Sequence, residues 1–237
     1  AMTGYEPIKF VSTAAHSGAS KGTSDWPLFR TAEVYLNYAE AKAELGTLTK
    51  DDLLISIDRI RDRAGMKGLD MAAANANPDP FLLACYPNVT KSENTGVILE
   101  IRRERTIELV MEGLRIWDMF RWKEGAQLVN ETNPYYGIYF SGPGLYDMDG
   151  DGRNDLELYV DKQTSSPADG LTVLRIGSDI ILSDMAENRG YVVAWSTLKY
   201  TWNEERDYLW PIPADQRVLT GGLLTQNPGW TDSTDFD

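Results

Sequence analysis

One stretch of the chain, residues 96–125, carries apolar positions on two sides of a predicted helix. Neither Pro nor Gly occurs in residues 97–112, which predicts one helix of about four turns there. Asn94 and Thr95 are suited to cap its start, and Gly125 is suited to end the helical stretch. Because a surface helix has a single apolar stripe, two apolar sides predict a central helix that is packed on both. The two sides are Ile98, Ile101 and Leu109 and, roughly opposite, Leu99, Ile107, Val110 and Met111.

The same predicted helix is rich in charge, and Arg105 and Glu108 fall near the Ile98 side. Buried charges persist only when they are paired and hydrogen-bonded. Two interpretations stay open: a buried ion-pair network in a central helix, or a solvated charged face whose pairs contribute roughly a few tenths of a kcal/mol each. The i,i+3 spacing allows three local pairs, Arg105–Glu108, Glu112–Arg115 and Asp118–Arg121.

Two further helices are predicted ahead of this stretch. Residues 30–45 repeat small and apolar side chains at helical spacing, and a glycine follows them. Thr49 or Asp51 caps the next helix, which runs to about Ala64 before Gly65 stops it. Two helices joined by about five residues make an antiparallel pair. Tetratricopeptide-type repeats use such pairs, although one pair is no repeat array.

The remaining segments predict irregular or extended structure. Residues 71–90 hold three prolines and predict a long irregular insertion. Residues 133–202 are rich in aromatic residues, Gly and Asp, and their short alternating runs predict a few strands that decorate the helical body. Residues 208–230 predict an irregular tail held by Trp210 and Trp230.

The composition argues against several classes of binding partner. The 237 residues allow a full core, and the shares of hydrophobic and charged residues, 42% and 25%, are ordinary for a folded chain. The formal net charge of -13 argues against nucleic acid and against a polybasic membrane contact, because both are bound through Lys and Arg. No apolar run reaches the length of a membrane span.

The sequence lacks the signatures of an enzyme. His16 is the only histidine and has no partner motif, which argues against a His-based zinc site and a Ser-His-Asp triad. Cys85 is the only cysteine, so no disulfide forms within the chain. The G-x-S-x-G, phosphate-loop and H-E-x-x-H motifs are missing. Two carboxylates suffice for glycoside hydrolysis, but no pair is singled out, and we expect a non-enzymatic protein.

The sharpest chemical motif is an acidic loop, D-x-D-x-D-G-x-x-D, at residues 147–155. Such a loop supplies the hard oxygens that Ca²⁺ takes, about six to eight of them. Leu158 stands where an EF-hand has Glu, and no flanking helix pair is evident, so the motif predicts a lone calcium loop with a structural role. The alternative is an acidic turn without metal, in which the carboxylates repel one another. The predicted ligands are Asp147, Asp149, Asp151, the Arg153 carbonyl and Asp155.

Aromatic residues in Gly-rich loops are the second candidate. Exposed rings stack on the apolar C–H faces of sugars, while nearby Asp and Asn bind hydroxyl groups. The alternative is a small satellite core under a loop, and Trp26 is either a loop anchor or a stacking platform. The predicted ligand-contacting residues are Tyr135, Tyr136, Tyr139, Trp26, Tyr86 and Trp195.

Four blocks, taken together, resemble one family, the SusD/RagB-like nutrient-binding lipoproteins of Bacteroidetes. Their order and spacing extend over nearly the whole chain, and the closing segments L-W-P-I-P (209–213) and Q-N-P-G-W (226–230) agree with the match. The blocks are Gly4-Tyr5 with Lys9-Phe10; R-x-A-E-V-Y-L-N-Y-A-E-A from Arg30; I-R-x-R-A-G-M from Ile60; and R-x-R-x-x-E-L-x-x-E-G-x-R-x-x-D-x-x-R-W from Arg103.

The resemblance implies a mostly α fold with tetratricopeptide-like helical pairs, long irregular loops and a few short strands. It implies a lipid-anchored position on the outer face of the outer membrane. There the protein would cover a SusC-like TonB-dependent transporter and capture oligosaccharide or polysaccharide. A structural domain that docks the transporter, and binding of peptide rather than glycan, stay open as alternatives.

Members of this family carry an N-terminal half, with the lipobox cysteine and further helix pairs, that this sequence lacks. We therefore expect a single domain over residues 1–237 that corresponds to the C-terminal half. Its helical core is expected at 28–66 and 95–125, with a loop-rich insertion at 133–202. An apolar patch is expected on the helical face where the missing N-terminal half would pack.

Overall fold

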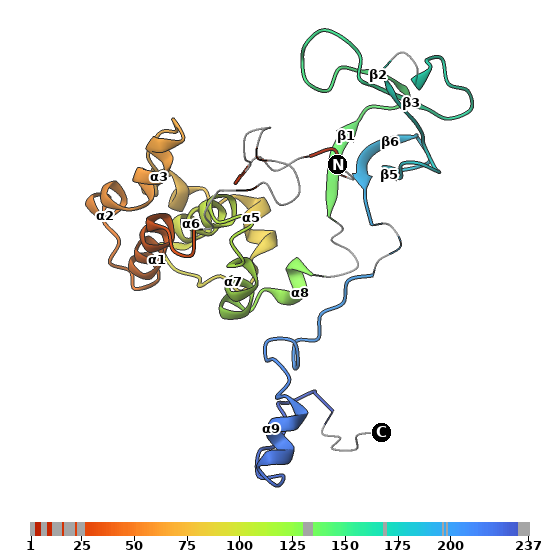
Figure 1. Ribbon diagram of the computed structural model, residues 1–237. Helices are drawn as coiled ribbons and strands as arrows, with labels where there is room; N and C mark the ends of the chain where they lie inside the picture. The colour runs from red at the N-terminus through yellow and green to blue at the C-terminus, as the bar shows by residue number, and fades with distance from the viewer. Residues whose placement is uncertain are drawn as a thin grey trace. The chain divides into compact units, whose positions relative to one another are not determined.

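The computed structural model describes residues 3–5, 9–10, 16, 22, 27–129, 135–167, 170–195, 197 and 199–231. Contacts divide the chain into two compact units. We call them the sheet unit (Ala1–Phe10 with Asn130–Tyr200) and the helical unit (Val11–Val129 with Thr201–Asp237). Figure 1 shows the elements of both. None of the described helices is long and apolar enough to span a membrane.

The first helix of the helical unit, α1 (Thr31–Glu44), agrees closely with the predicted helix over residues 30–45. Gly46 follows it with a positive φ of 69°, a conformation that suits glycine at a helix end. Leu36, Ala39 and Ala43 are buried on one side of α1, which packs against α6. The small side chains among them allow this close approach.

The second predicted helix is divided in two at Ser56. Its parts are α2 (Lys50–Ile55) and α3 (Ile57–Arg63). Thr49 forms a capping box with Asp52 at the start of α2, which confirms one of the two predicted caps. The Ser56 hydroxyl donates to the Asp52 carbonyl, four residues back. Bonds of this kind compete with the backbone ladder and bend helices, which explains the break.

The prediction of an irregular insertion at residues 71–90 is wrong for most of its length. Two short helices lie there, α4 (Met71–Ala76) and α5 (Pro80–Cys85). The side chain of Asp70 accepts from the first turn of α4, and that of Asp79 accepts from the first turn of α5. The proline that opens α5 stands where its missing N–H is not needed.

The central helix α6 (Thr95–Glu108) contacts α1, α3, α4 and α5. It ends before the predicted residue 112, and Met111 and Gly113 adopt left-handed conformations with φ of 64° and 77°. Gly96 allows α4 to approach, since a Cβ there would lie 1.9 Å from the Ala74 carbonyl oxygen.

Only part of the predicted double packing is present. Ile98, Ile101 and Leu109 are buried, as predicted for the first side. On the second side Leu99 is buried, whereas Ile107, Val110 and Met111 are 64%, 50% and 48% exposed. The helix is therefore enclosed in its first three turns and open at its C-terminal end.

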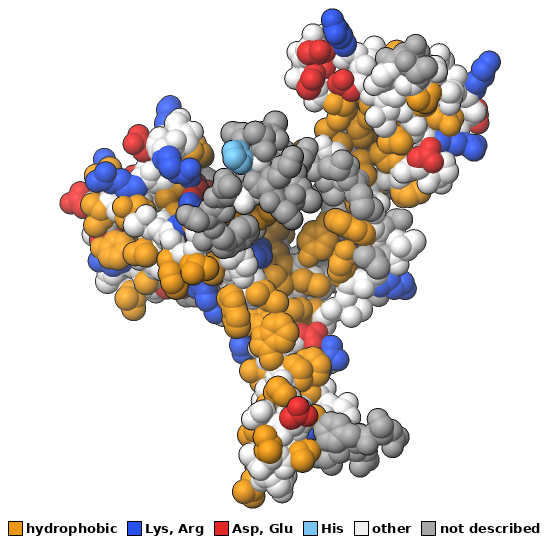
Figure 2. Space-filling model, in the orientation of Figure 1, with side chains coloured by type: hydrophobic (Ala, Val, Ile, Leu, Met, Phe, Trp, Pro, Cys, Tyr) orange, Lys and Arg blue, Asp and Glu red, His pale blue; other side chains and the backbone are white. Residues whose placement is uncertain are grey.

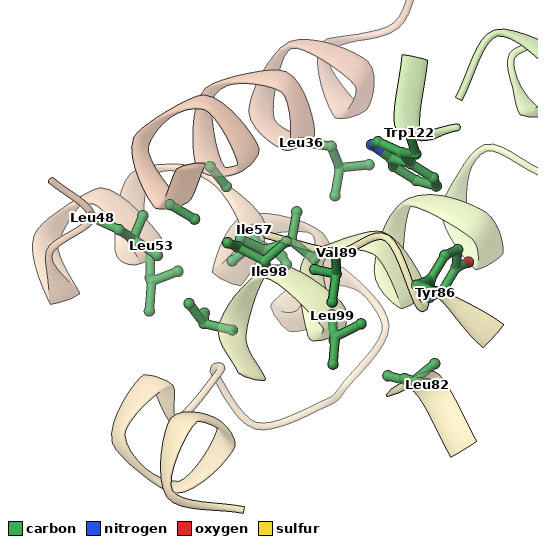
Figure 3. Packing of buried hydrophobic residues seen from close by; sticks show 14 of the residues in the cluster. Leu36, Leu48, Leu53, Ile57, Leu82, Tyr86, Val89, Ile98, Leu99 and Trp122 are labelled. Atoms are coloured by element: carbon green, nitrogen blue, oxygen red, sulfur yellow. The ribbon is translucent and has the colours of Figure 1, made fainter. Parts of the chain in front are cut away.

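The core of the helical unit gathers side chains from separate helices. Figure 3 shows Leu36, Ile57, Ile98 and Leu99 converging in one cluster. Trp122 joins it from α7 (Arg115–Trp122).

The other described helices of this unit are α8 (Gly125–Leu128) and α9 (Ala214–Leu219), the second of which interrupts the predicted irregular tail. The mostly helical prediction with a few short strands agrees with the described elements, whereas the tetratricopeptide-type pairing stays a prediction.

The described residues of the sheet unit form two three-stranded sheets. In the first, β6 (Arg189–Val193) lies between β1 (Tyr136–Phe140) and β5 (Leu182–Asp184), and both pairings are antiparallel.

In the second sheet, β3 (Leu156–Tyr159) pairs antiparallel with β2 (Gly144–Tyr146) and parallel with β4 (Thr172–Arg175). The strands carry a separate hydrophobic cluster of their own, so this part of the chain does more than decorate the helices. Its buried members are Phe140, Leu156, Leu158, Ile176, Leu182 and Val192.

The charges of the helical core are buried and paired across elements. Arg105 and Asp118, 4% and 2% exposed, form an ion pair of 2.7 Å between α6 and α7. Arg121 bonds to Asp118 at 3.0 Å and to Glu40 of α1 at 2.7 Å. The predicted Asp118–Arg121 pair is thus confirmed, and the buried network replaces the solvated-face interpretation.

The other two predicted local pairs, Arg105–Glu108 and Glu112–Arg115, are wrong because more distant partners are better placed. Arg30 binds both Glu108 and Glu112, at 2.9 and 2.6 Å.

A second buried pair joins Arg102 to Glu124, which is 0% exposed, at 3.6 Å. Among the described residues, Arg102 Nε and Nη1 and Glu124 Oε2 have no hydrogen-bond partner. The guanidinium instead lies 4.6 Å from the ring centroid of Trp122 and 5.5 Å from that of Tyr86. Burial raises the pKa of Glu124 to about 7, although the Asn88 N–H donates to its carboxylate.

Removing one partner of the Arg105–Asp118 pair leaves an uncompensated buried charge. Arg105→Met is expected to lower the free energy of unfolding of the helical unit by about 3–5 kcal/mol. The matched control is Arg103→Met on the same helix, whose side chain is 39% exposed and whose loss should cost about 1 kcal/mol or less. Urea unfolding followed by helical circular dichroism measures both, and equal losses would contradict the prediction.

The Glu124 carboxyl should make stability depend on pH. Its pKa lies near 7 in the folded chain against an ordinary 4.5, so the folded state loses stability as pH rises from about 4.5 to about 7. Glu124→Gln removes this titration. The free energy of unfolding of the variant, minus that of the unsubstituted protein, should therefore increase from pH 5 to pH 8. Glu157→Gln is the control, because hydrogen bonds from Thr164 lower the pKa of Glu157 to about 2. A difference for Glu124→Gln that does not change with pH would refute the assignment.

Candidate functional site

An exposed tyrosine cluster lies on the β1–β6 pair of the sheet unit. The rings of Tyr136 and Tyr191 stack, with centroids 5.4 Å apart and an interplanar angle of 23°, and Tyr139 meets Tyr191 edge-on at 5.2 Å. Tyr136 and Tyr139 are each 50% exposed and Tyr191 is 46% exposed. We call these three residues the tyrosine face. Neighbouring exposed tyrosines offer a broad apolar surface edged by hydroxyl groups.

A β-bulge brings two of these rings together. Residues three apart in a regular strand point to opposite sides of the sheet. Here Tyr136 pairs with Val193 and Tyr139 with Tyr191, so β1 holds one residue more than β6 over this interval. Such an extra residue re-aims the side chains beyond it. Both β1 tyrosines therefore contact the same ring on β6.

The sequence singled out two members of the tyrosine face and missed the third. The exposure of Tyr191 follows from the alternation of R-G-Y-V-V over residues 189–193, in which Arg189 and Tyr191 are exposed and Val192 is buried. Tyr135, also predicted, is 48% exposed and meets Tyr200 edge-on at 5.2 Å. Trp195 is 40% exposed and has no ring partner among the described residues.

The prediction that Tyr86 contacts a ligand is wrong. Tyr86 is 3% exposed in the core of the helical unit, where Trp122 meets its ring edge-on at 5.5 Å. Arg102 and Arg115 lie over the same ring. A ring enclosed in this way has no free face on which a ligand could stack. Trp26 lies outside the described residues.

The acidic loop brings three of its predicted ligands together. Carboxylate oxygens of Asp147, Asp149 and Asp151 all lie within 4.8 Å of one another on the exposed surface. The Gly150 and Gly152 N–H groups donate to Asp147 at 2.7 and 2.8 Å and lower its pKa.

The other two predicted ligands belong to the same turn. Asp155 accepts from the Met148 N–H at 2.7 Å, across the base of the loop. The Arg153 N–H donates to Asp151 at 2.8 Å. Gly152 has a φ of 87°, which meets the requirement for a sharp turn there. The oxygen-rich donor set fits a hard cation such as Ca²⁺, and the same carboxylates also fit a turn stabilised by its own backbone N–H groups.

Comparisons with known proteins find similarity over most of the chain. No match was found among curated proteins. The chain is similar to the crystal structure of a SusD-like protein from Bacteroides fragilis, with 24% sequence identity and a TM-score of 0.47. The similarity covers 86% of this chain and 26% of that one, so the chain spans about a quarter of that protein's length. The family model of the SusD family matches residues 1–230, and the chain belongs to this family.

Proposed function

We propose that this chain is a saccharide-binding part of a SusD-type nutrient-uptake system and has no catalytic activity of its own. The observation that carries the proposal is the tyrosine face, a set of exposed rings held by paired strands rather than by the core. Sugar rings present apolar C–H faces, which pack on aromatic rings, and the tyrosine hydroxyls bind the sugar hydroxyls at the edges. Membership of the SusD family supports the same role.

The proposed setting is the outer face of the outer membrane, with a lipid anchor in a part of the protein outside this sequence. There the protein would deliver oligosaccharide to a SusC-like TonB-dependent transporter. Family membership supports this setting, and no side chain of the described residues is assigned to the transporter.

A further part of the same protein is proposed to cover the helical unit. Apolar side chains are exposed at the C-terminal end of α6, among them Ile107 at 64% and Met111 at 48%. Figure 2 shows apolar side chains gathered on the visible face of this unit. Contiguous exposed apolar surface marks an interaction site, and this surface suits the N-terminal half that the family carries.

The proposal includes one structural Ca²⁺ in the acidic loop. The convergence of Asp147, Asp149 and Asp151 supports it, because like charges this close repel one another unless a cation or hydrogen-bond donors offset them. The ion would order the segment between β2 and β3, which carries no strand among its described residues.

Truncating the tyrosine face should weaken saccharide binding without unfolding the sheet unit. The double variant Tyr139→Ala with Tyr191→Ala is expected to weaken binding of the best neutral oligosaccharide from a glycan array by at least about tenfold, or about 1.4 kcal/mol. Isothermal titration calorimetry measures the loss. Leu145→Ala, a change at a residue 48% exposed on β2, is the control. Unchanged affinity in the tyrosine variant, or binding of peptides alone, would count against a saccharide role.

Calcium should stabilise the sheet unit through the acidic loop. At about 100 times its Kd the ion would add roughly 2.7 kcal/mol to the free energy of unfolding, and EDTA would remove that gain. Thermal unfolding followed by near-UV circular dichroism measures the shift. In Asp147→Asn with Asp151→Asn the shift should disappear, whereas Glu187→Gln, outside the loop, should keep it. A melting temperature that changes with neither Ca²⁺ nor EDTA would contradict the proposal.

A further inference from the structure

A groove of about 540 Å³ lies between α1 and α7 in the helical unit, on the outer side of the Arg105–Asp118–Arg121 network. Its lining includes Trp117 and Arg121 from α7 and Glu33, Asn37 and Glu44 from α1, above a buried floor that contains Asp118. The groove thus combines one large aromatic side chain with several planar polar groups. That combination is typical of sites that bind small polar ligands with a ring.

Trp117 is the aromatic member of the groove. It is 55% exposed, although the neighbouring Phe120 meets it edge-on at 5.9 Å. A tryptophan offers the largest apolar surface of any side chain, and its indole N–H remains able to bind a polar group. Its exposed surface is available to a ligand ring that enters the groove.

The floor of the groove is rigid before any ligand arrives. Arg105 and Arg121 both donate to Asp118, at 2.7 and 3.0 Å, and Arg121 also donates to Glu40 at 2.7 Å. Burial on its own would raise the pKa of Glu40, but the bonds from Arg121 and Trp122 lower it, so this carboxylate stays ionised. Fixed polar groups lose little freedom when a ligand binds, which favours affinity.

The rim keeps hydrogen-bonding capacity for a ligand. Asn37 uses its side-chain oxygen to accept from Arg105 at 2.6 Å, which leaves its NH₂ group to donate. The Glu33 side chain has no ion pair or hydrogen bond within the described part of the chain. Free carboxylate oxygens accept from hydroxyl groups, the groups that sugars present in number.

The charge of the lining selects among ring-shaped ligands. Among the lining residues, the carboxylates of Glu33, Glu40, Glu44 and Asp118 outnumber the guanidinium groups of Arg105 and Arg121. A third guanidinium, that of Arg102, pairs with Glu44 at 3.5 Å and leaves an excess of one negative charge. This excess of negative charge disfavours uronates, sulfated sugars and other anions, because like charges repel in a partly desolvated site.

We propose that the groove between α1 and α7 is a second saccharide site, separate from the tyrosine face, that takes a neutral pyranose ring against Trp117. Glu33, Asn37 and Arg121 bind the hydroxyls of that ring. The inference rests on the proposed saccharide function and adds to it a second site and a preference for neutral over acidic sugars.

The test follows the indole N–H resonance of Trp117 in the full chain, identified by its absence from Trp117→Phe. The probes are neutral gluco-, manno- and xylo-oligosaccharides, with oligogalacturonate as the acidic comparison. At least one neutral probe should shift this resonance, and oligogalacturonate should leave it in place. The shift should persist in Tyr139→Ala with Tyr191→Ala.

Calorimetry on variants completes the test. In the tyrosine variant, Trp117→Ala should weaken the remaining binding by about tenfold or more. Glu33→Ala, at a residue with no structural bond, should weaken it by about threefold. Phe81→Ala, at a residue 71% exposed on α5, is the control and should have no effect.

The outcomes separate the two proposals. If a neutral saccharide binds but neither moves the Trp117 resonance nor responds to Trp117→Ala, the second site is refuted and the tyrosine face stands. A response to oligogalacturonate alone, or binding of a protein at Trp117 without any saccharide effect, also overturns the inference. If none of the saccharides binds to either surface, the proposed function itself fails.

Discussion

The helical unit depends on the burial of the Arg105–Asp118 ion pair between α6 and α7. Both groups are almost fully removed from water, so each needs the other and needs further hydrogen bonds for its remaining atoms. Asn37 and Arg121 supply those bonds, and Arg121 extends the network to Glu40 on α1. Three helices are therefore held in one relative position by charges that cannot be satisfied separately. The apolar cluster around Ile98 and Leu36 lies in the same unit, and the burial of Arg105 and Asp118 strengthens the bond between them.

This network has a consequence for function as well as for stability. Its solvent side forms the floor of the groove beside Trp117, so the charges that hold the helices together also present fixed polar groups to a ligand. The tyrosine face obtains its rigidity differently. There the paired backbones of β1 and β6 set the spacing, and the bulge in β1 directs two rings toward Tyr191. In both places a rigid support carries an exposed aromatic surface, and ordering that surface on binding costs little.

Several features were predictable from the sequence because their causes are local. The extent of α1 follows from its composition and the glycine after it, and the start of α2 follows from the Thr49 capping box. The close approach of the acidic side chains at 147–151 follows from their alternate spacing in a turn with two glycines. Tyr136 and Tyr139 were recognisable as candidates, since aromatic residues beside glycines in a polar segment have few partners close in sequence.

Tertiary structure decided what local spacing could not. Arg105 had Glu108 within reach on its own helix, yet it binds Asp118, because that carboxylate is buried beside it and Glu108 is bound by Arg30. Tyr86 was predicted to contact a ligand, but Trp122 and Arg102 pack against its ring and enclose it. The side of the sheet on which Tyr139 lies depends on a one-residue shift in pairing with a strand some fifty residues away. The amino-acid sequence determined the caps, turns and residue types, whereas the partner of each buried charge and the exposure of each ring required the folded chain, because both depend on segments far apart in sequence.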